Sequence, residues 1–92
     1  MTVGSLRVRL LLREARSLKD KRQVVSSIKD RLRQRFNVSV AEVEAQENRQ
    51  LAVLGFAAVA NEASHARTML QQIIEALRAH PVAELLDYEM EV

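Results

Sequence analysis

Positively charged side chains recur in one stretch of the sequence at a spacing that suits phosphate binding. Within a helix predicted over residues 18–36, Arg22, Lys29 and Arg33 follow one another at intervals of seven and four residues and share one face. The preceding loop and the first helical turn add further cations close to a helix N-terminus, which itself favours anions. The predicted nucleic-acid or anion site comprises Arg16, Lys19, Lys21, Arg22, Lys29 and Arg33.

A solvated helix face is the simpler interpretation of the same cations. Lys21 lies near the buried line of the helix, so its stem is free to pack while its ammonium group reaches water. Ser17 and Asp20 resemble a capping box with Asp in place of Glu. Cations crowded around a positive helix end are unfavourable in isolation and become sensible if an anion binds there. Arg31 and Arg35 lie on the opposite flank of the helix.

Residues suited to catalysis or to metal binding are scarce. The chain has no cysteine, and its two histidines, His65 and His80, are fifteen residues apart in one predicted helix with no carboxylate at ligand spacing. No P-loop or dinucleotide-binding glycine motif occurs. Residues 13–17 also lack the glycines of the acylphosphatase phosphate loop. We therefore expect no enzymatic activity, no metal and no cofactor.

The 92 residues suffice for one domain, residues 1–92, and their charge is unevenly distributed. Residues 5–37 carry a net charge of +8 and residues 38–92 a net charge of −6. Such asymmetry marks either a surface that meets nucleic acid or two halves that neutralise each other in the fold. The absence of cysteine and of a long apolar run leads us to expect a cytoplasmic protein that does not enter a membrane.

The hydropathy pattern predicts six elements. They are a strand over 6–12, a helix over 18–36, a strand from 38 with a bulge near Ala41, a strand over 51–60 after a turn at 46–50, a helix capped by Asn61 and stopped before Pro81, and a strand over 86–92. Right-handed crossovers make this order a ferredoxin-like βαββαβ sandwich in the α+β class. Its four antiparallel strands take the order 4-1-3-2, with both helices on one face.

This fold leaves one sheet face open. The first strand turns Arg7 and Arg9 toward that face, opposite an acidic row in the last strand that consists of Asp87, Glu89 and Glu91. The alternate residues of the last strand should be buried, and these are Leu86, Tyr88, Met90 and Val92. Cross-strand ion pairs would neutralise both arginines, whereas phosphate binding would require them to leave their acids.

The open face is also a possible dimer surface, formed by Leu11, Val53 and Ala57. It lacks the aromatic platform on which single-stranded RNA bases stack in modules of this architecture, since the chain has only two Phe and one Tyr.

Several motifs resemble those of the domain-of-unknown-function 503, or YlxP-like, family. They are Ser17-Leu18-Lys19-Asp20-Lys21-Arg22, the run from Phe36 to Val43, Leu54-Gly55 and Leu85-Leu86-Asp87-Tyr88-Glu89. The resemblance spans essentially the whole chain. It implies a small bacterial cytoplasmic protein with a ferredoxin-like fold and no established activity. Family genes often lie among translation and ribosome-maturation genes, which associates the family with RNA or the ribosome.

Two functions remain open. The first is a non-enzymatic RNA- or ribosome-associated module that contacts phosphate through the basic helix and the loop before it. The second is a protein-interaction module, a homodimer formed through the open sheet face or an edge strand.

Overall fold

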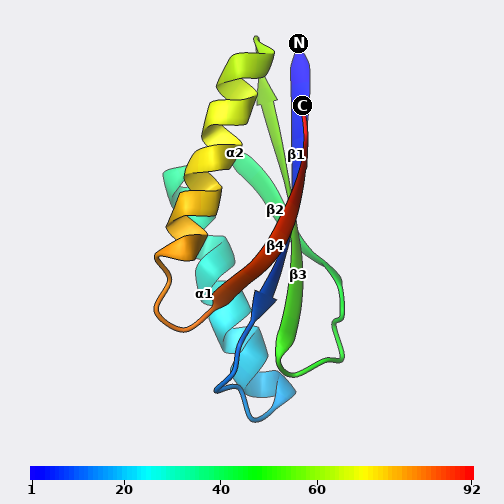
Figure 1. Cartoon of the computed structure of the whole chain (residues 1–92), viewed down its shortest axis with the longest axis vertical. Helices are drawn as coiled ribbons and strands as arrows, with labels where there is room; N and C mark the ends of the chain where they lie inside the picture. Colours follow the sequence, from blue (N-terminus) through cyan, green and yellow to red (C-terminus); the bar gives the residue numbers. More distant parts are fainter.

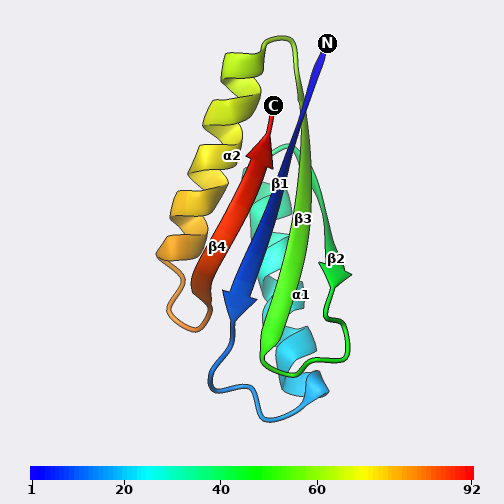
Figure 2. The same ribbon diagram turned by 45° about the vertical axis from the view of Figure 1, so that its right-hand side comes forward.

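A computed structural model describes residues 1–92 and contains a four-stranded sheet and two helices. The elements are β1 (Thr2–Leu11), α1 (Leu18–Arg35), β2 (Val38–Glu44), β3 (Leu51–Ala60), α2 (Ala63–Arg78) and β4 (Glu84–Glu91). The strands are antiparallel in the order β2-β3-β1-β4, which is the predicted ferredoxin-like order read from the other edge (Figure 2). The molecule measures 42 × 21 × 20 Å.

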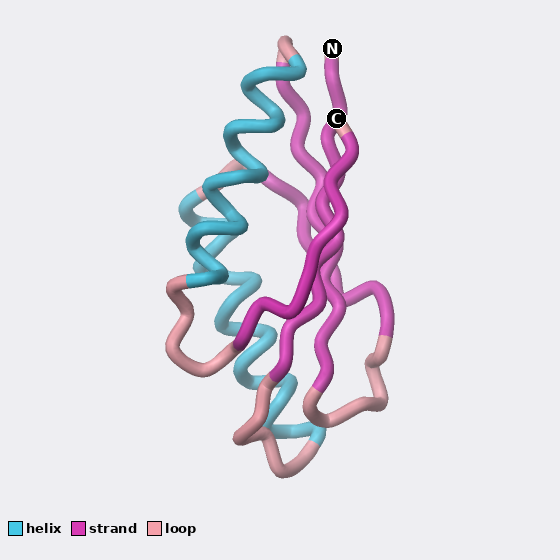
Figure 3. The backbone as a smooth tube through the Cα atoms, viewed as in Figure 1, coloured by secondary structure: helices cyan, strands magenta, loops and turns pink.

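Both helices cover one face of the sheet (Figures 1 and 3). Alternation along β1 turns Leu6, Val8 and Leu10 toward the helices, where each is at most 1% exposed. The two helices complete the core with buried side chains such as Ile28 and Ile73. Neither helix is both long and apolar enough to cross a membrane. The helices thus leave the other sheet face uncovered, as predicted.

The predicted bulge in β2 is present, but it lies at Val43, two residues beyond Ala41. Glu42 pairs with Leu54 and Glu44 with Val53, so Val43 is the extra residue. Val43 lies on the open face, where its Cγ1 would be 3.0 Å from a Cβ at Gly55. The extra residue turns Glu44 to the open face and leaves Glu42 on the helix side.

A second bulge, at Leu86 in β4, overturns part of the predicted burial of that strand. Asp87 pairs with Arg9 and Leu85 with Leu10, so Leu85 takes the inward place expected for Leu86. The exposed side chains are Leu86 at 41%, Tyr88 at 43% and Val92 at 38%, while Met90 is partly buried. β4 is an edge strand, and α2 lies mainly over β1 and β3. The side chains of β4 are therefore less covered by the helix.

Candidate nucleic-acid interface

The N-terminus of α1 is capped from within the chain, as the Ser17–Asp20 motif predicted. The backbone N–H of Asp20 donates to Ser17 Oγ at 3.0 Å, and the backbone N–H of Arg16 donates to Asp20 Oδ2 at 3.0 Å. The Asp20 carboxylate therefore supplies a negative charge to the positive helix end. This resident anion partly offsets the surrounding cations without any ligand.

Lys21 is buried, so the expectation that its ammonium group reaches water is wrong. Its side chain is fully inaccessible, and Nζ lies 2.8 Å from Glu42 Oε2 and donates to Ala45 O at 2.6 Å. Ala45 adopts a left-handed backbone with a φ of 60° just after β2. Because Lys21 is already paired and shielded from solvent, it cannot contact phosphate, and the prediction that it belongs to the anion site is wrong.

The other predicted cations stay on the surface. Arg16, Lys19, Arg22 and Lys29 take part in none of the seven ion pairs of the structure. Arg33 is held more firmly, since it lies 3.4 Å from Asp30 Oδ1 and donates to Val40 O at 3.2 Å, with its side chain 47% exposed. These five residues are called the α1 basic surface below.

Arg49 is a cation near this surface that the sequence analysis missed. It belongs to the turn between β2 and β3, yet it lines the same surface hollow as Arg16. Two hydrogen bonds hold the two loops together, from Leu12 N to Gln50 O at 2.7 Å and from Gln50 Nε2 to Arg13 O at 3.0 Å. Sequence spacing carries no sign of this proximity, because the two residues are joined only through the pairing of β1 with β3.

The arginines of the open face are neutralised, as the cross-strand interpretation predicted. Arg9 lies 3.4 Å from Asp87, and Arg7 lies 3.8 Å from Glu89 and 2.6 Å from Glu44. The hydrogen bond and the charge of Glu44 are the main causes that raise the pKa of Arg7. Glu44 was not predicted here, since only the bulge brings it to this face.

The predicted dimer face is largely covered. Val53 is only 2% exposed because it lies between Arg9 and Glu44, its partners on the neighbouring strands. Leu11 is half-buried, and Ala57 alone of the three is exposed. Val53 is therefore unavailable for contact with another chain.

The two histidines lie near opposite ends of α2. The N-cap of that helix is Glu62, without a side-chain hydrogen bond, and the predicted cap Asn61 instead places Oδ1 3.2 Å from His65 Nδ1. His80 lies beyond the end of the helix, in the turn before β4, contrary to its predicted helical position. No group of three or more His, Cys, Asp or Glu side chains is placed to hold a metal ion.

Known proteins share this sequence pattern and this fold. The family model described as "Protein of unknown function (DUF503)" matches residues 3–90. The "Uncharacterized protein YlxP" of Bacillus subtilis (strain 168) is 30% identical over 82 residues, which cover 89% of each chain. A de novo designed protein with ferredoxin fold aligns with a TM-score of 0.62 at 15% identity, over 100% of this chain and 87% of its own. The de novo designed protein Foldit4 aligns with a TM-score of 0.59 at 13% identity, over 99% of this chain and 98% of its own. The designs support the fold alone, whereas the match over nearly the whole sequence shows that the chain belongs to the DUF503 family.

Proposed function

We propose that the protein is a non-enzymatic module that binds structured RNA, on the ribosome or in its precursors, by contacting phosphates with the α1 basic surface. The distribution of unpaired cations carries this proposal. Eight of the fourteen Lys and Arg side chains lie outside ion pairs, and four of these eight, Arg16, Lys19, Arg22 and Lys29, belong to the α1 basic surface. Arg49, a fifth unpaired cation, lies beside Arg16. The fold thus neutralises the arginines of β1 and leaves most cations of α1 outside ion pairs.

Contacts of this kind recognise shape more than sequence. Cations on a convex helix reach phosphate oxygens, while direct reading of unpaired bases needs a stacking surface. The open face offers charged pairs and small side chains in the places where such an aromatic surface would lie. A folded RNA with closely spaced phosphates is therefore the expected ligand, in preference to a single strand.

Salt dependence measures the number of contacts. Four phosphate contacts would weaken binding roughly 50- to 150-fold between about 50 and 200 mM salt, because each contributes a slope of about 0.7–0.9. The test compares a structured ribosomal RNA fragment with a matched DNA duplex across this range. We expect tighter binding to RNA with a steep salt slope.

A matched pair of variants locates the surface. R22E/K29E should lose at least tenfold in RNA affinity and show about half the salt slope. R67E/R78E changes the net charge equally on α2 and should retain most of the affinity, with folding of both variants checked by circular dichroism. Equal losses in the two variants, or no RNA binding by the natural protein at about 50 mM salt, would refute the proposal.

A homodimer through the open sheet face is the second candidate. Val3 and Val59 are register partners on that face and are 55% and 57% exposed, next to the exposed Ala57. Such an apolar cluster on an otherwise charged face suits contact with a second sheet. Sedimentation equilibrium should then show a dimer that V59R converts to a monomer. A monomeric natural protein at about 100 μM would dismiss this candidate.

A further inference from the structure

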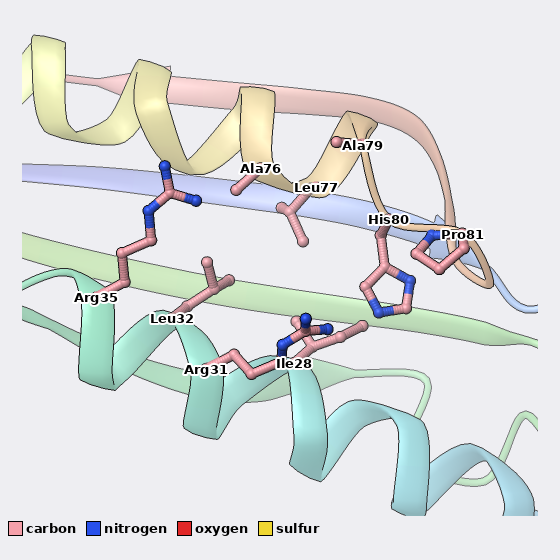
Figure 4. A pocket seen from close by; sticks show the side chains of 9 residues that line it. All are labelled: Ile28, Arg31, Leu32, Arg35, Ala76, Leu77, Ala79, His80 and Pro81. Carbon is pink, nitrogen blue, oxygen red and sulfur yellow. The ribbon is translucent and has the colours of Figure 1, made fainter.

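A groove between the two helices contains the remaining unpaired arginines of α1. It has a volume of about 350 Å³, within the range of small-molecule sites. Its floor is apolar and includes Ile28, Leu32 and Leu77, and Arg31 and Arg35 rise into it from α1 (Figure 4). His80 faces Arg31 from the turn after α2. None of the nine residues that line the groove is acidic.

The backbone around His80 selects one tautomer of its ring. The N–H groups of Val82 and Ala83 donate to His80 Nδ1 at 3.2 and 3.1 Å, so this nitrogen must hold a lone pair. The proton of the neutral ring is therefore on Nε2. Ala83 is only 4% exposed, which anchors the turn and with it the ring. Nε2–H is left as a donor on the side of the ring that faces Arg31, another donor (Figure 4).

The electrostatics of the groove favour an anion. Neither Arg31 nor Arg35 forms an ion pair, and Arg35 is steadied by the ring of Phe36, whose centroid lies 5.1 Å from the guanidinium carbon. Burial and, second, the charge of Arg31 lower the pKa of His80, so the ring stays a neutral donor near pH 7. Two positive charges and a fixed N–H group thus face an apolar floor.

We propose that this groove binds a small phosphate monoester with a flat apolar body, its phosphate held between Arg31 and His80 Nε2–H and its body lying on Leu32 and Leu77. A phosphate monoester carries nearly two negative charges at pH 7, which suits a groove with two arginines and no acidic side chain, and its terminal oxygens suit the guanidinium fork of Arg31 together with the His80 N–H donor. The small volume excludes a peptide helix. The floor distinguishes such an ester from inorganic phosphate, because only the ester buries apolar surface there.

Phenyl phosphate is the probe for the test, titrated into the isotope-labelled full chain at pH 7 and low salt. The His80 ring and Arg31 Nε–H resonances should shift saturably, with the His80 ring remaining the Nε2–H tautomer. Inorganic phosphate should bind at least fivefold more weakly, and phenol should not bind. R31Q/R35Q should weaken binding of phenyl phosphate at least tenfold, whereas R22Q/K29Q should leave it unchanged.

Three results of the phenyl phosphate titration would overturn the proposal. They are shifts that do not saturate by about 20 mM probe, equal affinity for phenyl phosphate and inorganic phosphate, and unchanged binding by R31Q/R35Q. Failure of this proposal can be told apart from failure of the RNA proposal, since R31Q/R35Q tests the groove and R22Q/K29Q tests the α1 basic surface. If the ribosomal RNA fragment shifts the same His80 resonances and R31Q/R35Q abolishes both RNA binding and these shifts, the groove is part of the RNA interface and the small-ligand proposal falls.

Discussion

Replacing Lys21 with methionine is expected to destabilise the fold strongly while leaving RNA binding intact. Methionine retains most of the apolar stem, so the change removes mainly the ammonium group and its two contacts, to Glu42 at 2.8 Å and to Ala45 O at 2.6 Å. The position also lies within the motif that first indicated anion binding. The variant thus separates a structural role for Lys21 from a role in binding.

The burial of the pair sets the size of the effect. Removing one partner of a buried ion pair costs about 3–5 kcal/mol, because the other partner is left uncompensated. Glu42 is 17% exposed, so water partly compensates its charge and we expect the lower end, about 3 kcal/mol. A chain of 92 residues has a total stability of roughly 5–14 kcal/mol, so the variant should still fold. Its melting temperature should fall by roughly 12–24 °C.

Urea unfolding at pH 7 measures this cost and, with a second variant, its origin. K21M should lower the midpoint without changing the dependence on urea, whereas K21M/E42L removes both charges and should regain all but about 1 kcal/mol. The RNA affinity of folded K21M should lie within twofold of that of the natural protein. A loss below about 1 kcal/mol, or a loss of RNA affinity as large as that of R22E/K29E, would refute this account of Lys21.

Three further predictions concern stability. The lowered pKa of His80 means that the folded state binds fewer protons than the unfolded state as the pH falls. The free energy of unfolding should therefore be fully retained above about pH 6.5 and fall as the pH drops toward the folded pKa. H80Q should flatten this part of the pH profile, and an H80Q profile identical to that of the natural protein would contradict the prediction. A Cβ at Gly4 would lie 3.1 Å from Leu70 Cδ1, so G4V should cost about 1–3 kcal/mol in urea unfolding, and a neutral result would mean that α2 moves away freely. S17A removes the acceptor for the Asp20 N–H and should cost about 1 kcal/mol, whereas S17D should retain most of the stability.

The sequence was sufficient to predict the fold because its local signals agree with one another. Alternation in β1, the apolar run of β3 and the Ser17–Asp20 cap each specify one element, and the order of six elements leaves few topologies. The pairing of Arg7 and Arg9 with the acids of β4 also followed from topology, because neighbouring antiparallel strands place alternate residues opposite one another.

Two of the details that failed depend on single extra residues. One bulged residue, Val43, brings Glu44 to Arg7, and another, Leu86, reverses the expected inward position in β4. Period-2 reasoning predicted the bulge in β2 only to within two residues and gave no sign of the bulge in β4, since the pattern on either side of an extra residue remains regular. The burial of Lys21 and the nearness of Arg49 to Arg16 likewise arise from contacts between distant segments.

The bulge at Val43 also fixes how β2 pairs. A strand at the edge of a sheet has one neighbour and can slide along it or recruit a foreign strand. Here the two glutamates that flank the bulge point to opposite faces, Glu42 to Lys21 beneath the helix and Glu44 to Arg7 on the open face. A slip by one residue would deprive the buried ammonium group of Lys21 of Glu42 and deprive Arg7 of its closer partner, Glu44. Ion pairs on both faces of β2 therefore fix its register against β3 and oppose its pairing with a strand of another molecule.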